Sequence, residues 1–195
     1  MKAKTSGIIY IAVLAALICS FCDKIHVITN TLYYPQPVFD GQPWWTFPGF
    51  FVAFVTMCIV YLQLVKHLPA QIDKTFSTSS GNVQKLTESL LLFAFVYLLS
   101  GFGNEYPLYL NVLFYSTFLI RLAVTSDKQF ILIVSLILGI SGTLGEGLLS
   151  EFGLVYYTKP VVFHMPLWLA GVYMHGAFAL RECMRFFVYR LQPAN

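Results

Sequence analysis

The stretch YYPQPVFDGQPWW occupies residues 33–45 and lies between two long apolar runs, and a similar stretch, YYTKPVVFHMPLW, occupies residues 156–168 between two more. The same offset that aligns them pairs Asp23 with Glu146 upstream. Loops at a membrane surface are often rich in Tyr, Trp and Pro, but matches that keep register favour a repeat. The sequence therefore predicts two similar helical hairpins, each turning over at an aromatic, proline-rich loop. The matched positions are Tyr33/Tyr156, Tyr34/Tyr157, Pro37/Pro160, Val38/Val161, Pro43/Pro166 and Trp45/Trp168.

The composition is that of an integral membrane protein. Of the 195 residues, 57% are hydrophobic and only 11% are charged, and the mean hydropathy is +0.70, whereas soluble domains carry about 25% charged residues. We expect one all-α, polytopic domain over residues 1–195, a six-helix transmembrane bundle with no soluble domain and no nucleic-acid partner. A spanning helix needs roughly 20 apolar residues, and the six such runs are Gly7–Val27, Trp44–Val65, Leu86–Phe102, Leu108–Val124, Phe130–Leu149 and Pro166–Tyr189.

The basic residues are sorted unevenly between the two sides of the membrane. Six spans place both termini on one side, and only Lys24 and Lys159 then fall on the other. Because cytoplasmic loops carry an excess of Lys and Arg, both termini are predicted to be cytoplasmic and the two aromatic loops lumenal or periplasmic. The ten basic residues on the side of the termini are Lys2, Lys4, Lys66, Lys74, Lys85, Arg121, Lys128, Arg181, Arg185 and Arg190.

Two segments on the cytoplasmic side have distinct compositions. The polar stretch at residues 66–85, which contains TFSTSSGN at 75–82, is predicted to be a flexible loop. The last span closes with RECMR at residues 181–185, an amphipathic basic end that is typical of contact with anionic cytoplasmic lipid.

Acidic side chains gather at the other end of the spans. Under the repeat interpretation, Asp23 and Glu146 sit at matching depths on the first and fifth helices. An apolar pocket with a few polar groups at one end suits an amphipathic lipid, whereas the alternative is a set of loop-end charges that face water. The candidate residues at the mouth of such a cavity are Asp23, His26, Trp44, Trp45, Glu146, Tyr157 and Trp168.

A catalytic interpretation is the main alternative from another class. Asp23 with His26, together with Glu146 and Glu151, would make a general acid/base or metal site of an enzyme that acts on an isoprenoid or sterol-like lipid. No H-E-x-x-H motif, nucleophile elbow, P-loop or dinucleotide fingerprint is present in the sequence. We therefore expect no enzymatic activity, no catalytic residues, no metal site and no cofactor. A transporter is disfavoured because few charges lie within the spans.

Two motifs resemble those of a known family. The segment FDGQPWWTFP at residues 39–48 resembles the F-D-x-x-W-W-x-x-P segment that enters the second helix of Insig (insulin-induced gene) proteins. The segment GLVYYTKPVVF at residues 153–163, followed by Trp168 and Leu169, is similar to the family's G-V-Y-x-Y-T-x-P-D-F…W-L near the start of the last helix. The likeness extends over most of the chain at low density.

The resemblance implies a regulatory lipid-binding protein without catalysis. Insig proteins retain sterol-sensing membrane proteins in the endoplasmic reticulum when oxysterols are bound, and bacterial relatives bind diacylglycerol, in both cases in a central pocket. The partner-binding aspartate of the family, in the turn between the fourth and fifth spans, corresponds to Asp127. The expected partners are thus a membrane lipid and another polytopic membrane protein, in the endoplasmic reticulum membrane of a eukaryote or the inner (plasma) membrane of a bacterium.

The chain also departs from the family pattern. The basic run expected after the partner-binding aspartate is reduced to Lys128. Glu146 and Glu151 bring more negative charge to the end of the fifth helix than the resemblance leads us to expect. These departures weaken the expectation of sterol-dependent partner binding. They leave the expectation of lipid binding unchanged.

Overall fold

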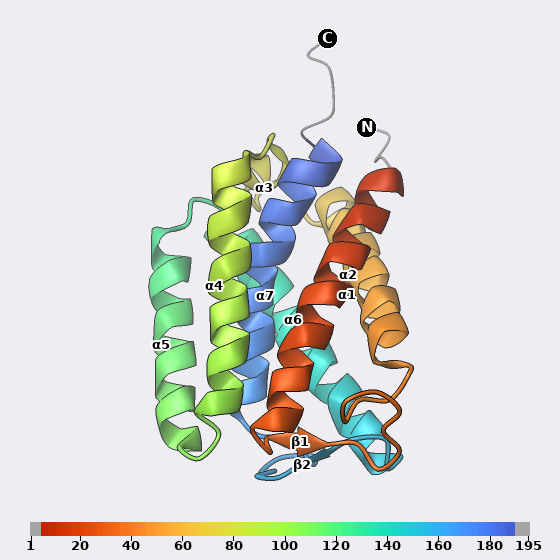
Figure 1. The fold of residues 1–195 in the computed structure, drawn as a ribbon. Coiled ribbons are helices and arrows are strands. Elements are labelled where there is room, and N and C mark those ends of the chain that lie inside the picture. The colour runs from red at the N-terminus through yellow and green to blue at the C-terminus, as the bar shows by residue number, and fades with distance from the viewer. Residues whose placement is uncertain (1–4, 190–195) are drawn as a thin grey trace.

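The computed structural model describes residues 5–189 and is built from long helices (Figure 1). It confirms the predicted all-α membrane bundle, apart from two strands of two residues each, β1 (Leu32–Tyr33) and β2 (Tyr156–Tyr157). A short helix, α3 (Thr75–Thr78), lies between α2 and α4. The long helices are α1 (Thr5–Ile28), α2 (Thr46–His67), α4 (Val83–Phe102), α5 (Pro107–Val124), α6 (Lys128–Glu151) and α7 (Trp168–Cys183), which continues as the π-helix η1 (Met184–Tyr189).

Five of these helices are long and apolar enough to cross a membrane by length and composition: α1, α2, α4, α5 and α6. The sixth predicted span corresponds to α7, which has 16 residues, and to the six residues of η1. Helices are the expected solution in hydrocarbon because each satisfies its own backbone hydrogen bonds. The count of six spans and the cytoplasmic location of the termini stay predictions.

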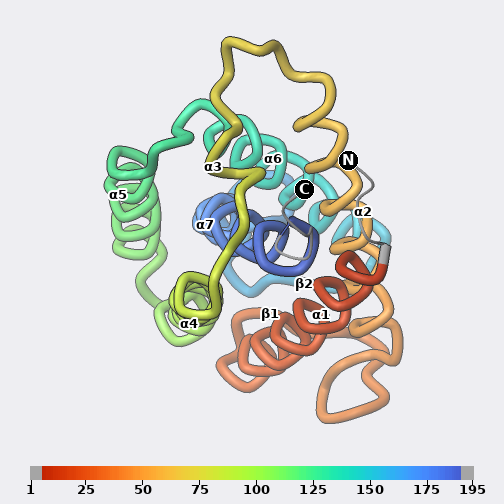
Figure 2. The backbone as a smooth tube through the Cα atoms, turned by 90° about the horizontal axis from the view of Figure 1, so that it is seen from above, coloured from red at the N-terminus to blue at the C-terminus, as the bar shows by residue number. Residues whose placement is uncertain are grey.

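Helix α7 is the centre of the bundle (Figure 2). It packs against α4, α5 and α6, while α1 packs against α2, α4 and η1. The start of α1 touches η1, because a Cβ atom on Gly7 would lie 2.4 Å from the carbonyl oxygen of Phe187. The two ends of the described chain therefore lie together at one end of the bundle, and β1 and β2 lie at the opposite end (Figure 1).

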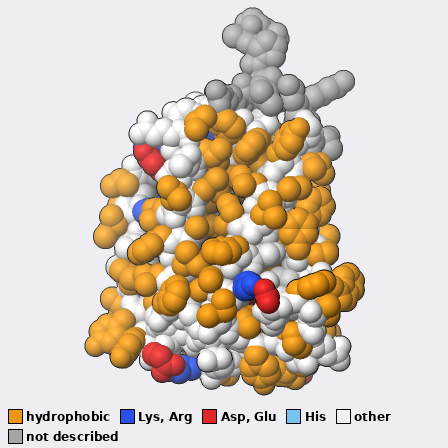
Figure 3. All heavy atoms as spheres, viewed as in Figure 1, with side chains coloured by type: hydrophobic (Ala, Val, Ile, Leu, Met, Phe, Trp, Pro, Cys, Tyr) orange, Lys and Arg blue, Asp and Glu red, His pale blue; other side chains and the backbone are white. Residues whose placement is uncertain are grey.

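Hydrophobic side chains cover the face of the molecule seen in Figure 3 almost from end to end, and charged side chains on it are few. Large apolar residues of the outer helices are strongly exposed, for example Leu91 on α4, Tyr109 on α5 and Ile140 on α6. Such a surface matches the hydrocarbon of a bilayer rather than water, in agreement with an integral membrane protein.

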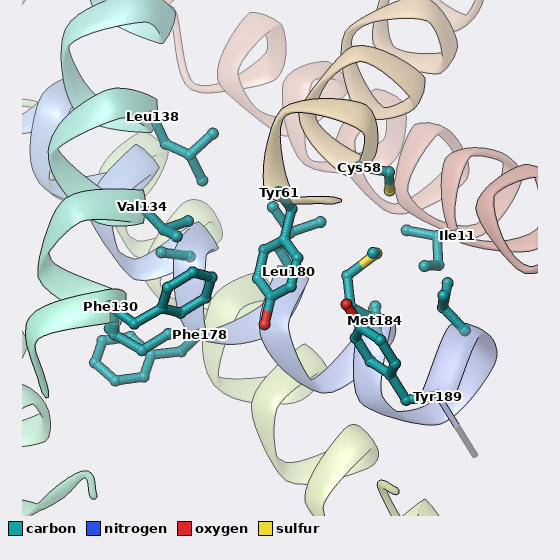
Figure 4. Close-up of a cluster of buried hydrophobic side chains, with 14 of the residues drawn as sticks. Ile11, Cys58, Tyr61, Phe130, Val134, Leu138, Phe178, Leu180, Met184 and Tyr189 are labelled. Atoms are coloured by element: carbon teal, nitrogen blue, oxygen red, sulfur yellow. The ribbon is translucent and has the colours of Figure 1, made fainter. Parts of the chain in front are cut away.

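A cluster of buried side chains closes the end of the bundle where α1 begins (Figure 4). The ring of Tyr61 on α2 meets that of Phe130 on α6 edge to face, with centroids 5.1 Å apart. The Tyr61 hydroxyl donates a hydrogen bond to the carbonyl oxygen of Ser77, at 3.1 Å. Two helices that belong to different hairpins are thereby joined at this end, beneath the loop that carries α3.

The two hairpins predicted from the sequence repeat are present. Strands β1 and β2 pair antiparallel, with Tyr33 opposite its equivalent Tyr156. When equivalent residues face one another in this way, a local two-fold axis passes between them. Helix α1 ends at Ile28 and α6 ends at Glu151, which are equivalent at the offset of 123 residues that separates Tyr33 from Tyr156.

The backbone of the two loops repeats even where their sequences differ. In the first, Phe39 pairs with Gln42 around a two-residue turn in which Asp40 and Gly41 have φ values of 47° and 85°. In the second, the equivalent residues Val162 and Met165 pair around Phe163 and His164, whose φ values are 47° and 63°. Positive φ at both central residues defines a type I′ hairpin, which favours Asn, Asp and Gly.

The polar loop at residues 66–85 is more ordered than predicted. The Arg185 Nη2 atom of η1 donates hydrogen bonds to Ser79 Oγ at 3.1 Å and to the Ser80 carbonyl oxygen at 3.2 Å. The Gly81 backbone N–H donates to the carbonyl oxygen of Arg185 at 3.0 Å. The prediction of a flexible loop is therefore wrong for residues 75–81, which are anchored to the last helix.

Candidate functional site

A cavity of about 530 Å³ lies in the middle of the bundle, between α1, α2, α4, α6 and α7. Its wall is mostly apolar, with contributions such as Phe54 from α2 and Phe93 from α4. The polar groups lie mainly at the end near the strands, where Tyr34, Thr46 and Glu146 line it. Ligand cavities in proteins commonly have volumes of about 300–1,000 Å³, apolar walls and a few polar groups that fix orientation, so this space has the properties of a ligand site.

Glycines of α6 shape the cavity. A Cβ atom on Gly142 would lie 2.6 Å from the ring of Tyr173, so the absence of a side chain there lets the tyrosine of α7 lie directly against α6. A Cβ atom on Gly145 would meet nothing within 4 Å. The glycine-rich end of α6 thus provides close packing at one position and open space at the other.

Asp23 and Glu146 occupy equivalent places on the two sides of the local two-fold axis. Tyr34 donates a hydrogen bond to Asp23 Oδ2 at 2.8 Å, and the equivalent Tyr157 donates to Glu146 Oε2 at 3.4 Å. Burial raises the pKa of both tyrosines well above the ordinary range, so they are protonated donors. The repeat therefore extends from the backbone to a matched pair of tyrosine–carboxylate hydrogen bonds.

The two carboxylates differ in their second partner and in their access to the cavity. Asp23 is 3% exposed and also accepts a hydrogen bond from Gln42 Nε2 at 2.7 Å, which closes it off with the first loop. Glu146 lines the cavity and accepts a hydrogen bond from the Tyr173 hydroxyl at 3.0 Å. The equivalents of Gln42 and Tyr173 in the other half are Met165 and Phe50, which cannot form these bonds. The two acids thus have symmetric positions but different hydrogen-bond partners and different access to the cavity.

The tryptophans of the predicted site lie at different depths. Trp45 lines the cavity and meets Tyr34 edge to face, with centroids 5.6 Å apart. Its equivalent, Trp168, is fully buried behind the cavity and packs on Tyr157 at 6.4 Å. Trp44 is 69% exposed and is absent from the cavity wall. Of the three, only Trp45 is placed to touch a ligand.

His26 faces α4 rather than the carboxylates. Its Nε2 atom lies 2.9 Å from Ser100 Oγ, and Ser100 donates its own proton to the Tyr97 carbonyl oxygen at 2.6 Å. His26 is therefore the donor to Ser100, and it fills the interior beside Gly101, whose Cβ atom would lie 2.7 Å from the imidazole. The acid/base pairing of Asp23 with His26 that the catalytic alternative requires is not assembled. Within residues 5–189, no three His, Cys, Asp or Glu side chains are placed to hold a metal ion.

Asp127 is buried at the other end of the bundle. It is 1% exposed, and its carboxylate accepts hydrogen bonds from Arg181 Nη1 at 2.7 Å, from Thr125 Oγ1 at 2.9 Å and from the Ser77 hydroxyl. Arg181 also pairs with Glu182 at 3.0 Å. The carboxylate is therefore not free to meet a partner at the surface while the loop that carries Ser77 stays in place.

The arginines at the end of α7 complete this buried network. Arg185 Nη1 pairs with Glu182 Oε2 at 2.7 Å, and its guanidinium lies 3.8 Å from the ring centroid of Phe76. Arg181 and Arg185 are only 8% and 7% exposed. The interpretation of residues 181–185 as a lipid-facing basic end is therefore wrong, because these arginines satisfy buried carboxylates instead.

Comparisons with known proteins identify a solved structure with the same fold. No family model matches the chain, and no curated protein matches it significantly. The crystal structure of a mycobacterial Insig homologue, MvINS from Mycobacterium vanbaalenii, superimposes with a TM-score of 0.81 over 100% of both chains, at 18% sequence identity. The chain has the Insig fold. A cross-linked trimer of a cysteine-substituted MvINS matches with a TM-score of 0.78, again over 100% of both chains and at 18% identity.

The Insig fold agrees with the resemblance drawn from the two loop motifs. The first motif contains the hairpin turn between Phe39 and Gln42, and the second contains β2 and the equivalent turn that begins at Val162. A sequence identity of 18% shows a shared fold but not shared residue roles. The role of each residue is therefore inferred from the geometry of this chain.

Proposed function

We propose that the protein is a non-enzymatic regulatory protein that holds a neutral lipid, diacylglycerol or an oxysterol, in its central cavity and acts by binding another membrane protein. The observation that carries this proposal is an apolar cavity of about 530 Å³ with a carboxylate, Glu146, in its wall near the strands. A lipid hydroxyl is accommodated there by hydrogen bonding, while its hydrocarbon part lies against the apolar wall. The Insig fold supports the regulatory part of the proposal.

The route into the cavity lies between α2 and α6. These two helices are not among those that pack closely against one another. Residues of the cavity wall on both are exposed: Gly49 and Thr56 on α2, and Ser141 and Gly145 on α6. A lipid diffusing in the bilayer reaches the cavity sideways through this gap, without crossing water.

The partner-binding face in this proposal is the end of the bundle around Asp127, and α7 connects it to the lipid in the cavity. Leu180 and Cys183 line the cavity, and Arg181 and Glu182 lie between them in the sequence and belong to the network around Asp127. A lipid that shifts α7 therefore changes the geometry of this network and of the loop anchored to it. In this scheme Asp127 keeps the partner-binding face in the shape that the partner recognises. The membrane is the endoplasmic reticulum membrane of a eukaryote or the inner membrane of a bacterium.

The test is to identify the lipid carried through purification. Native mass spectrometry of the wild-type protein is expected to show a bound neutral lipid, and added diacylglycerol or oxysterol is expected to raise the melting temperature. Gly145→Trp, which places an indole in the opening, is expected to lose the lipid. Leu144→Trp is the matched control, because Leu144 is exposed on the same helix and does not line the cavity. Wild-type protein without lipid and without a thermal shift would contradict the proposal.

A further inference from the structure

Three hydroxyl groups of the cavity wall have already donated their protons. Tyr34 donates to Asp23 at 2.8 Å, Tyr173 to Glu146 at 3.0 Å, and Thr46 to the Pro43 carbonyl oxygen at 3.1 Å. A hydroxyl has one proton and two lone pairs. The three groups therefore present only acceptor lone pairs to a molecule in the cavity, which adds to the acceptor capacity of the carboxylate itself.

The charge of Glu146 is not offset by a basic side chain. Among residues 5–189, no Lys or Arg forms an ion pair with Glu146 or with Asp23. Lys24, the basic residue next to Asp23 in the chain, pairs with Asp40 instead. Buried carboxylates usually have a cationic partner or several donors, and here the donors are tyrosines and one glutamine.

Two uncharged donors remain in the cavity wall. Within the described part of the chain, the Tyr97 hydroxyl and the Trp45 indole N–H form no hydrogen bond, and both residues line the cavity. Each can orient an oxygen of a ligand, but neither offsets a negative charge. The wall therefore tolerates a ligand acceptor, while the carboxyl group of Glu146 favours a ligand donor.

The second carboxyl group strengthens this preference. Asp23 accepts a hydrogen bond from the Tyr34 hydroxyl at 2.8 Å, and both Tyr34 and Glu146 line the cavity. Two carboxyl groups without a basic partner are therefore joined to the end of the cavity near the strands, Glu146 directly and Asp23 through Tyr34.

We propose that Glu146 selects lipids by the charge and hydrogen-bonding of the head group: it favours a long-chain amine over the alcohol of the same chain, and it disfavours the carboxylic acid. An ammonium offers three donors and a compensating charge, an alcohol offers one donor, and a carboxylate repels Glu146. This inference rests on the proposed lipid site and deepens it, because diacylglycerol and oxysterols satisfy the acceptor only through a hydroxyl group.

The test uses four lipids that share one hydrocarbon chain: oleylamine, oleyl alcohol, methyl oleate and oleic acid. Each competes at neutral pH with a fluorescent diacylglycerol for the purified, detergent-solubilised protein. We expect the amine to bind about tenfold more tightly than the alcohol, as a charge-assisted hydrogen bond implies, and the acid to bind most weakly. Glu146→Gln is expected to remove the gap between amine and alcohol, to strengthen binding of the acid and to leave methyl oleate unchanged.

Glu151→Gln is the matched control. Glu151 lies on the same helix, pairs with the exposed His164 and does not line the cavity, so the order of the four lipids is expected to stay unchanged. If Glu146→Gln does not fold, Tyr173→Phe replaces it: Glu146 then loses a donor that stabilises its charged form, and the preference for the amine is expected to narrow.

The outcomes separate the two proposals. If the alcohol and the ester displace the probe but the amine has no advantage, or if the advantage survives in Glu146→Gln, the selection by Glu146 is overturned and the lipid site stands. If none of the four lipids displaces the probe and the probe itself does not bind, the proposed lipid site is overturned, and the selection with it.

Discussion

Tyr33 stacks on Tyr156, with ring centroids 5.3 Å apart and planes inclined by 30°. The two residues are equivalent in the repeat and opposite one another in the two-stranded sheet. One contact therefore joins the two hairpins at their axis, and it does so directly beside the tyrosines that hold the carboxylates.

Removing those tyrosine hydroxyls is expected to destabilise the protein unequally. Tyr34→Phe leaves Asp23 without a donor at 2.8 Å, whereas Tyr157→Phe removes a longer contact of 3.4 Å. A buried acceptor that loses its partner costs about 1–3 kcal/mol, so we expect the larger loss for Tyr34→Phe. Thermal unfolding in detergent measures it. Tyr33→Phe, on an exposed ring, is the control with no loss, and equal losses for the two buried tyrosines would contradict the asymmetry.

Adding a methyl group to α6 is expected to have unequal effects on stability at two positions two residues apart. In Gly147→Ala the Cβ atom would lie 2.1 Å from the ring of Phe163, whereas in Gly145→Ala it would meet nothing within 4 Å. Overpacking costs about 1–3 kcal/mol, so Gly147→Ala lowers the melting temperature and Gly145→Ala does not. A comparison of the two melting temperatures in the same detergent checks this, and a similar loss for both variants would refute it.

Asp127→Ala is expected to cost about 3–5 kcal/mol, because it removes one of the two carboxylates that pair with the buried Arg181 guanidinium. Replacing both residues, as Asp127→Ala with Arg181→Met, is expected to recover part of this loss. Glu88→Ala, which breaks an exposed pair with Lys85, is the control and is expected to have little effect. Thermal unfolding of wild type, Asp127→Ala, Arg181→Met and the double variant gives the coupling. A single Asp127→Ala variant as stable as wild type would show that the network is not a structural element.

The first loop carries a pH-sensitive contact. A hydrogen bond from the Lys24 ammonium holds the pKa of the exposed Asp40 below its ordinary value. A lowered pKa means that the contribution to stability is present above the ordinary aspartate pKa and is lost as the pH falls through the lowered value. In Lys24→Met the Asp40 pKa is expected to rise toward the ordinary value, as measured by NMR titration of labelled aspartate. An unchanged titration would show that the two side chains do not interact.

Hydropathy and the repeat predict most of the helices, because both report on which residues are buried and in what order. α1 and α6 correspond closely to their predicted spans. The anchored loop at residues 75–81 was beyond such reasoning, because its order depends on Arg185, which is more than a hundred residues away in the sequence. The prediction that Arg181 contacts lipid is wrong for the same reason. Its spacing in the sequence indicates a basic helix face, but not which carboxylate that face contacts.

In the candidate site, too, the sequence predicts some residues and not others. The constant offset identifies Asp23, Glu146, Tyr34 and Tyr157 as equivalent, and the structure joins each acid to its tyrosine. Tyr173 was missed, since its equivalent, Phe50, has no hydroxyl and the repeat therefore gives no signal. Its hydroxyl meets Glu146 only because Gly142 lets α7 approach α6.

The hairpin turn at Phe163 and His164 keeps the backbone of the Asp40–Gly41 turn although it contains none of the Asn, Asp and Gly residues that a type I′ turn favours. The two hairpins therefore share a backbone shape that their sequences alone do not require. Within that shape, Gln42 and Tyr173 have no chemical counterparts in the other half, so the two acids have different partners and only Glu146 lines the cavity. A pair of identical hairpins could not make that distinction, because symmetry would give both acids the same surroundings.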